Sequence, residues 1–214
     1  MLKLCLLILA GLTTLALLEI IRRRLKVTNE DSRKIYHVVH GIIIAIAPFL
    51  VSYKIIILLE LFLLVTMFLV KTFNLFPWLY RVGRLSWGEY FGVVAVILIA
   101  LLEPSKWVFL AALLHLGVAD ALAAVIGKRY GKKHQFNVFG QTKSWPGSLT
   151  FFVSSLALTT MVIVASQSTR DSLLLLALLP LLTALAEAAS PYGSDNFIVP
   201  VLVTVVLSSL QFAA

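Results

Sequence analysis

Long runs of apolar residues, separated by short polar connectors, follow one another along the whole chain. A helix needs about 20 apolar residues to cross the hydrocarbon layer of a membrane. We expect membrane-spanning helices at 4–21, 36–52, 55–72, 90–102, 106–126, 148–166, 172–189 and 196–212. The runs at 36–52 and 90–102 are short, which favours tilting or shielding by neighbouring helices. The pattern predicts an all-α, polytopic membrane helical bundle with about eight transmembrane helices, or seven as the alternative count.

Composition supports this class: 60% of the residues are hydrophobic, 13% are charged and the mean hydropathy is +0.99. With 214 residues and short connectors there is no room for a separate soluble domain. We therefore expect one membrane-embedded domain over 1–214, with an anchor helix at 1–21 and a motif-bearing core at 30–200. The first run lacks a small-residue cleavage site and is followed by Arg22, Arg23 and Arg24, so we interpret it as a retained anchor.

The basic residues predict the orientation in the membrane. Of the 18 Lys and Arg residues, 14 fall in one set of connectors, and the other four are Lys3, Lys54, Lys106 and Arg170. The positive-inside rule places the richer set in the cytoplasm and both termini outside. Most carboxylates lie at the same end, so we expect an active site at the cytoplasmic membrane surface. The net charge of +8 suits anionic lipid head groups and a phosphorylated substrate better than nucleic acid, since no nucleic-acid module is present.

The polar stretch from Asp120 to Ser148 contains the densest group of candidate functional residues. Asp120 shares a helical face with Ala123, Ala124 and Gly127. Because a carboxylate inside a membrane span costs several kcal/mol unless it is partnered, Asp120 is a functional candidate. Basic, glycine and hydroxyl residues, which suit a phosphate and its metal ion, follow: Lys128, Arg129, Gly131, Lys132, Lys133, His134, Gly140, Lys143, Ser144, Gly147 and Ser148.

Two familiar motifs are excluded in this stretch. The segment from Gly140 to Ser144 is not a P-loop, because Thr142 stands where the second glycine belongs and we expect no strand before it. Gly127-x-x-x-Gly131 resembles a helix-dimerisation motif, but the charged residues between the glycines disfavour packing within lipid. We expect a flexible basic loop between two spans.

Two further groups of polar residues flank this stretch. Arg33 and Lys34 are suited to phosphate oxygens, and His37 to carrying a proton or contacting phosphate. The alternative is a positive-inside flank with His37 and His40 at the interface; a lone histidine pair is a weak metal signal. Glu89 suits either a ligand role or the first turn of a helix, and Glu60, within a predicted span, has no explanation.

The connector before the final span carries Glu187, Asp195 and Asn196 around a glycine-containing turn. These oxygens could form a cage for Mg²⁺. Alternatively, Asp195 caps the final helix and Glu187 pairs with a lysine. Both interpretations remain open at this stage.

Four ordered groups run from about residue 30 to residue 200: Arg33-Lys34-x-x-His37; Asp120-x-x-Ala123-x-x-x-Gly127-x-x-x-Gly131; Lys143-Ser144-Trp-x-Gly147-Ser148; and Glu187 with Ser190, Gly193, Asp195-Asn196 and Pro200. In order and spacing they resemble the family of CTP-dependent lipid kinases that includes dolichol kinase, phytol kinase and the CTP-using diacylglycerol kinase. One position departs from the family pattern: Pro146 precedes Gly147, where an acidic residue is expected.

The resemblance implies transfer of the γ-phosphoryl group of CTP to a lipid alcohol, giving a lipid monophosphate and CDP. The alcohol would be a prenol (phytol, geranylgeraniol, polyprenol or dolichol) or diacylglycerol. Because the sequence shows no organelle signal, we expect the membrane to be the plasma membrane of a prokaryote. Asp120, Glu187 and Asp195 would bind Mg²⁺, or one of them would accept the hydroxyl proton, with Lys143 as a further catalytic residue. The implied phosphate-binding residues are Arg33, Lys34, His37, Gly127, Lys128, Gly131, Lys143, Ser144, Gly147, Ser148 and Asn196.

Two other functions remain as alternatives. A phosphatidate cytidylyltransferase also joins CTP to a lipid, but its glycine-rich His-Gly-Gly segment and paired Asp residues have no counterpart near Gly193 and Asp195. A small transporter would use buried carboxylates such as Glu60 and Asp120 to line a pathway. No internal repeat supports a transporter, and the polar residues gather at one surface.

Overall fold

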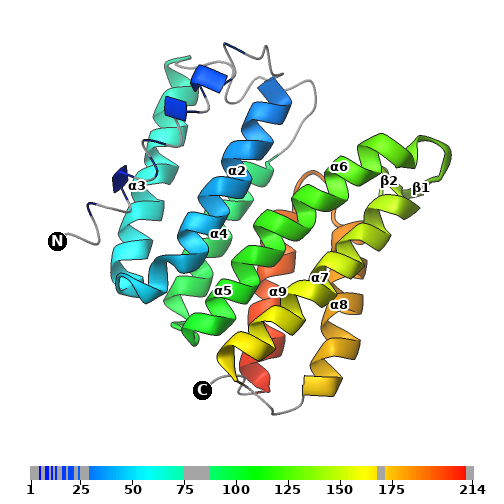
Figure 1. Cartoon of the computed structure of the whole chain (residues 1–214). Helices are drawn as coiled ribbons and strands as arrows, with labels where there is room; N and C mark the ends of the chain where they lie inside the picture. Colours follow the sequence, from blue (N-terminus) through cyan, green and yellow to red (C-terminus); the bar gives the residue numbers. More distant parts are fainter. Residues whose placement is uncertain are drawn as a thin grey trace.

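The computed structural model describes residues 29–74, 87–167 and 172–210, together with scattered residues between 5 and 24. For residues 29–34 and 172 it describes the backbone alone. The predicted first span at 4–21 therefore lies largely outside the described residues. The elements below refer to the described part of the chain (Figure 1).

Helices account for most of this part of the chain, as the apolar pattern predicts. They are α2 (Asn29–Ile46), α3 (Tyr53–Thr72), α4 (Gly88–Leu101), α5 (Lys106–Leu114), α6 (Asp120–Tyr130), α7 (Trp145–Ser166), α8 (Ser172–Ala189) and α9 (Asp195–Ser209). Three short helical segments, η1 (Ala47–Phe49), η3 (His115–Ala119) and η4 (Gly131–Lys133), continue or connect them. Every predicted span from 36–52 onward coincides with one of these helices, so the helical class is confirmed.

Helix length varies more than the predicted spans suggest. Among the described residues, three helices are long and apolar enough to cross a membrane: Tyr53–Thr72, Lys106–Lys133 and Trp145–Ser166. Four shorter apolar helices accompany them: Ile35–Phe49, Gly88–Leu101, Leu173–Ala189 and Asp195–Ser209. At 1.5 Å per residue, a helix of about 14 residues is roughly 21 Å long, less than a hydrocarbon core of about 30 Å. The helical bundle is therefore confirmed, while the count of eight spans is not.

The helix from Lys106 to Lys133 contains a π turn, η3, in its middle. Within this turn His115 is fully buried; its Nδ1 donates to the carbonyl oxygen of Ala111 at 2.7 Å. Its Nε2 lies 2.9 Å from Ser155 Oγ on α7, which lies 2.9 Å from Thr183 Oγ1 on α8. This chain of hydrogen bonds satisfies polar groups that would be costly in an apolar interior. It also fixes the π turn, and with it the orientation of α6, against two neighbouring helices.

The connector between α6 and α7 is a β-hairpin, so the expectation of a flexible loop and of an entirely helical chain is wrong here. Strands β1 (Gln135–Val138) and β2 (Gln141–Ser144) pair antiparallel, with Val138 opposite Gln141. Phe139 and Gly140 form the turn with positive φ values of 46° and 74°, the conformation that suits a tight hairpin. Four-residue strands are too short to stand out by alternation, and phenylalanine is an unusual residue at this turn position.

The hairpin also corrects one argument against a P-loop, since β1 does precede Gly140. The other argument holds, because Thr142 replaces the second glycine and the chain continues into β2. At the base of the hairpin the rings of Phe136 and Trp145 lie 5.0 Å apart, and the Trp145 N–H donates to the carbonyl oxygen of His134 at 3.0 Å. These contacts hold β2 against the start of α7.

Glycines at three positions bring α6 and the start of α7 together. A Cβ atom on Gly147 would lie 3.2 Å from the Ala123 carbonyl oxygen and 3.4 Å from Gly127 Cα. Gly131 is buried beneath Ser144, whose Oγ would lie 2.4 Å from an added Cβ. Ser144 in turn caps α7 by accepting a hydrogen bond from the Gly147 N–H at 3.3 Å. Gly127 and Gly131 thus serve close packing within the chain.

We predict that Gly131→Ala lowers the stability of the protein by about 1–3 kcal/mol, because Ser144 cannot accommodate the added methyl group without a shift. The thermal midpoint of the protein in detergent measures this effect. Gly11→Ala is the control, since no described residue lies within 4 Å of a Cβ at that position. Ser144→Gly in the Gly131→Ala background should restore part of the loss, because glycine is a tolerable N-cap. Equal midpoints for Gly131→Ala and Gly11→Ala would contradict the packing argument.

Candidate functional site

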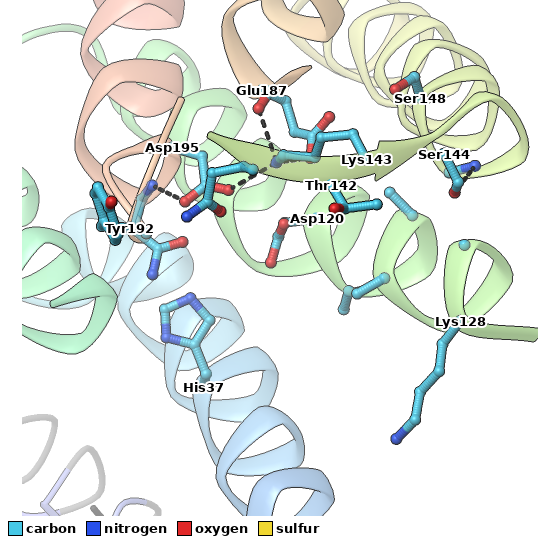
Figure 2. A pocket seen from close by; sticks show the side chains of 18 of the residues that line it. His37, Asp120, Lys128, Thr142, Lys143, Ser144, Ser148, Glu187, Tyr192 and Asp195 are labelled. Carbon is cyan, nitrogen blue, oxygen red and sulfur yellow. Dashed lines mark hydrogen bonds and ion pairs between the residues drawn. The ribbon is translucent and has the colours of Figure 1, made fainter. Parts of the chain in front are cut away.

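A pocket of about 690 Å³ lies where the hairpin, α2, α6 and the turn before α9 meet. Figure 2 shows side chains from these separate segments directed toward a common space. The pocket combines polar groups with small apolar ones. Its lining residues are His37, Val38, Asp120, Ala121, Ala123, Ala124, Gly127, Lys128, Gln135, Gln141, Thr142, Lys143, Ser144, Gly147, Ser148, Glu187, Tyr192, Gly193, Asp195 and Asn196.

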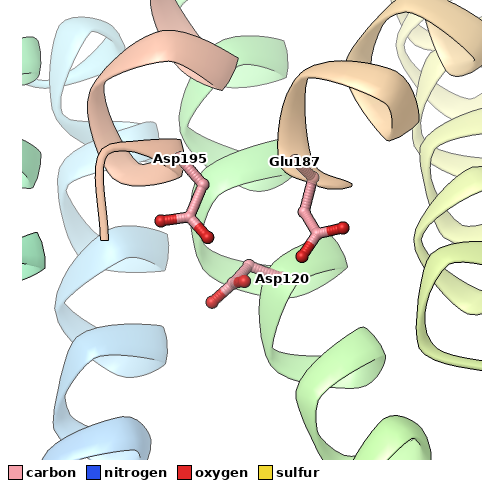
Figure 3. A group of neighbouring side chains, drawn as sticks. All are labelled: Asp120, Glu187 and Asp195. Atoms are coloured by element: carbon pink, nitrogen blue, oxygen red, sulfur yellow. The ribbon is translucent and has the colours of Figure 1, made fainter. Parts of the chain in front are cut away.

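Three carboxylates from three helices converge in this pocket (Figure 3). Asp120 begins α6, Glu187 lies in the last turn of α8 and Asp195 begins α9. One oxygen of each lies within 4.8 Å of the others. These are the three residues that the sequence predicts as metal ligands. Like charges this close repel one another unless a cation lies among them.

A tight turn between α8 and α9 makes this convergence possible. Tyr192 and Gly193 have positive φ values of 53° and 86°, so the chain reverses within a few residues and brings Asp195 back toward Glu187. Two long-range hydrogen bonds anchor the turn to the start of α4. The Asn196 side chain donates to the Gly88 carbonyl oxygen at 2.8 Å, and the Trp87 N–H donates to the Tyr192 carbonyl oxygen at 3.1 Å. The predicted site residue Asn196 thus holds the turn in place and also lines the pocket.

Lys143 supplies the positive charge beside the carboxylates. Its Nζ donates to Glu187 Oε1 at 2.5 Å and to the Glu187 carbonyl oxygen at 2.9 Å, and lies 3.6 Å from Asp195 Oδ2. Burial alone would lower the pKa of Lys143, but Glu187, Asp195 and, more weakly, Asp120 outweigh it and raise the pKa. The lysine therefore remains charged throughout the physiological pH range. Strand β2 places it there, which a flexible loop would not do.

The donor set of this cluster fits a magnesium ion. Mg²⁺ prefers oxygen ligands, and Asp120, Glu187 and Asp195 offer only carboxylate oxygens. Glu187 Oε2 is buried and has no hydrogen-bond partner among the described residues. That oxygen is free to bind a cation while Oε1 faces Lys143. A divalent ion and the Lys143 ammonium group would nevertheless compete for the same cluster.

Most of the predicted phosphate-binding residues line the pocket. His37, Gly127, Lys128, Lys143, Ser144, Gly147, Ser148 and Asn196 do so. Ser148 Oγ is buried without a hydrogen-bond partner in the described part of the chain. Gly131 is not among the lining residues and packs beneath Ser144 instead. Arg33 and Lys34 belong to α2 by their backbone, and their side chains lie outside the described residues.

The structure adds Gln135, Gln141, Thr142 and Tyr192 to the predicted site residues. Three of them belong to β1 or β2, so recognising the hairpin from sequence would have placed them beside Lys143. Tyr192 precedes Gly193, and its positive φ could not be read from its residue type. Pro146, the departure from the family pattern, lies in the first turn of α7. Proline is favourable there because its missing N–H would have no partner within the helix.

Comparison with known proteins supports the resemblance that the motifs indicate. The phytol kinase of Synechocystis sp. is 32% identical over 130 residues, which cover 58% of this chain and 54% of that protein. The chain therefore spans about half the length of this curated relative. No family model matches the chain, and no solved structure matches it. The likeness supports the resemblance to a lipid kinase family of this type.

We predict that Lys143→Met strengthens divalent-cation binding about tenfold, because a charge-assisted contact that competes for Glu187 is removed. Binding of Mn²⁺, used as a spectroscopic substitute for Mg²⁺, is measured on the purified protein in detergent. Asp195→Asn should weaken the binding, since it removes one ligand charge. Lys132→Met serves as the control because Lys132 does not line the pocket. Equal Mn²⁺ affinities for the wild type and Lys143→Met would refute the competition.

Proposed function

We propose that this protein is an integral membrane lipid kinase that transfers the γ-phosphoryl group of CTP to the hydroxyl group of a lipid alcohol. The observation that carries the proposal is the cluster of Asp120, Glu187, Asp195 and Lys143 in a pocket at the end of apolar helices. Phosphoryl transfer depends mainly on positioning and charge neutralisation, which such a cluster provides. The relationship to phytol kinase supports kinase activity in general.

The phosphates of the nucleotide would bind near Lys143 and the first turn of α7. Ser144, Gly147 and Ser148 line the pocket at this point, where the N-terminus of α7 carries a partial positive charge. Ser148 Oγ is buried and has no hydrogen-bond partner among the described residues, so it is available to a bound phosphate. Lys128 adds a further cation at the rim of the pocket.

Asp120, Glu187 and Asp195 are the residues that would hold Mg²⁺. A bound Mg²⁺ supplies neutralisation of the charge that develops on the transferring phosphoryl oxygens. The three carboxylates would fix the position of the reacting phosphate relative to the lipid hydroxyl. Lys143 would remain close enough to neutralise phosphate charge, since its ammonium group already lies against the carboxylates of Glu187 and Asp195.

The lipid alcohol would enter between α2 and α6. Val38 on α2 and Ala121, Ala123 and Ala124 on α6 line this side of the pocket. Their small apolar side chains leave room for a hydrocarbon chain. Asp120, also on α6, would lie near the hydroxyl end of the lipid. The name of the relative favours an isoprenoid alcohol such as phytol, ahead of diacylglycerol.

We further propose that the pocket faces the cytoplasm across a prokaryotic plasma membrane. Lys128, Lys132 and Lys133 lie at the same end of the long helix as the pocket, whereas Lys106 begins that helix at the other end. This distribution matches the positive-inside rule. The relative that supports the family comes from a prokaryote, the cyanobacterium Synechocystis.

We predict that the purified protein transfers label from γ-labelled CTP to phytol or geranylgeraniol in detergent, with release of CDP. Asp120→Asn should lower kcat about a thousandfold, comparable to the loss of other charge-stabilising groups in active sites. Glu103→Gln, at an exposed acid outside the pocket, is the matched control and should retain activity. Pyrophosphate release with phosphatidate would instead identify a cytidylyltransferase. A well-folded Asp120→Asn protein with full activity would contradict the assignment of Asp120.

We also predict that a chelator abolishes the activity and that added Mg²⁺ restores it, because three carboxylates and an incoming nucleotide require cationic neutralisation. Initial rates before and after chelation, and after readdition of Mg²⁺ or Ca²⁺, measure this dependence. Ca²⁺ should restore less activity, because it prefers longer bonds and more ligands. Unchanged activity after complete removal of divalent ions would contradict the metal role of Asp120, Glu187 and Asp195.

A further inference from the structure

A second, smaller cavity lies deeper in the bundle, between α2, α3 and α4. This inner chamber has a volume of about 30 Å³, and four titratable residues line it: His37, His40, Glu60 and Glu89. Its remaining lining residues, among those the structure describes, are apolar or glycine. A space of this size with several polar partners is sufficient to hold a water molecule. So many titratable groups around one small cavity within apolar helices need an explanation.

Glu60 is the least expected of these groups. It lies within α3, one of the helices long and apolar enough to span the membrane, and its exposed fraction is 1%. Its Oε1 lies 3.5 Å from His40 Nε2 on α2. Its Oε2 is buried and has no hydrogen-bond partner among the described residues. An ionisable group at such a depth is costly, so its presence there points to a function.

His37 connects the inner chamber to the candidate active site. It lines both the large pocket and the inner chamber. Its position follows from helical spacing, since His37 and His40 are one turn apart on α2. On α4, Gly92 packs beside the ring, since a Cβ atom there would lie 3.5 Å from His37 Cε1, at van der Waals contact. A proton that leaves the large pocket at His37 therefore needs one further transfer to reach the chamber.

The proposed reaction releases a proton that the pocket carboxylates are poorly placed to accept. When the lipid oxygen bonds to the γ-phosphorus, the bond from that phosphorus to the β-bridging oxygen breaks and the hydroxyl proton must leave. Glu187 and Asp195 face the Lys143 ammonium group, and Asp120 completes the same cluster. Carboxylates held by cations are weak bases. A group next to this cluster and outside it would be a stronger base than the carboxylates that face Lys143.

We propose that the inner chamber is the proton acceptor of the kinase reaction, with His37 as the first carrier and the His40–Glu60 pair as the destination. This inference rests on the proposed kinase function. The lipid hydroxyl gives its proton to a His37 ring nitrogen, which passes it through a chamber water to the Glu60 carboxylate. Transfer of the proton to solvent after CDP leaves restores the starting state. His37 is then a catalytic residue, and His40 and Glu60 act through it.

The groups that face the His40–Glu60 pair come from three helices. On α2 they are His37 and Tyr36, whose ring stacks on His40 with centroids 5.7 Å apart. On α4 Glu89 lines the chamber, and α3 contributes Glu60 itself. The chamber-lining residues on α5 and η3, Leu113 and Leu116, carry no charge. A merely structural pair would hold α2 to α3 through one hydrogen bond and would not influence the pH dependence of the reaction.

Glu60→Gln separates the two roles, because glutamine keeps the size and a hydrogen bond to His40 but cannot accept a proton. We expect kcat for phytol phosphorylation by CTP to fall about a hundredfold, the usual contribution of a proton acceptor, with KM unchanged. The wild-type kcat should fall as the pH is lowered and the acceptor becomes protonated, whereas the variant should lose this dependence. Glu60→Asp, which retains a carboxylate, should recover part of the rate.

Ile56→Val is the matched control, since Ile56 is fully buried one turn earlier on the same helix. His40→Asn gives an independent test of the pair if Glu60→Gln lowers the yield of folded protein. The inference would be overturned if Glu60→Gln and His40→Asn both had the wild-type kcat and the wild-type pH profile. The kinase function would still stand. If the wild type labels no lipid from any nucleotide, the proposed function fails, and the proton acceptor with it.

Discussion

The contact between Lys143 and the pocket carboxylates is the interaction on which the rest of the site depends. Three carboxylates with oxygens within 4.8 Å of one another would repel strongly in a partly buried site. The ammonium group of Lys143 offsets that repulsion and at the same time ties β2 to the end of α8 and the start of α9. Breaking a buried pair costs more than forming it contributes, because the remaining charge is left unmatched. The hairpin therefore has a structural reason to stay folded against the helices.

The sequence predicted the helices well, because their signal is strong and local. Apolar runs identify helices from the local sequence alone, and each predicted span in the described region coincides with a helix. It also predicted that Asp120, Glu187 and Asp195 belong together, through their likeness to a family motif. Spacing alone could not show this, since Asp120 and Glu187 are brought together only by the packing of α6, α7 and α8.

What the sequence could not predict depends on backbone conformation and on pairs of residues far apart. The sequence did not predict the hairpin, because its strands are only four residues long and its turn begins with Phe139 at positive φ. Glu60 had no explanation until the fold placed it 3.5 Å from His40, on a different helix. Gly131 was assigned to phosphate binding because glycines often surround phosphates, whereas its actual neighbour is the side chain of Ser144. In each case the decisive contact involves a segment that the local pattern does not identify.

The π turn before Asp120 determines the direction in which the pocket-lining face of α6 points. A π turn holds one residue more than the α-helical turn that it replaces, and one residue corresponds to a rotation of about 100° about the helix axis. If residues His115–Ala119 were shortened by one residue, the helix would remain intact and apolar. Asp120 and Gly127 would then turn away from the pocket together. The arrangement of this pocket thus depends on the angle through which α6 is rotated about its axis, as well as on which carboxylates line the pocket.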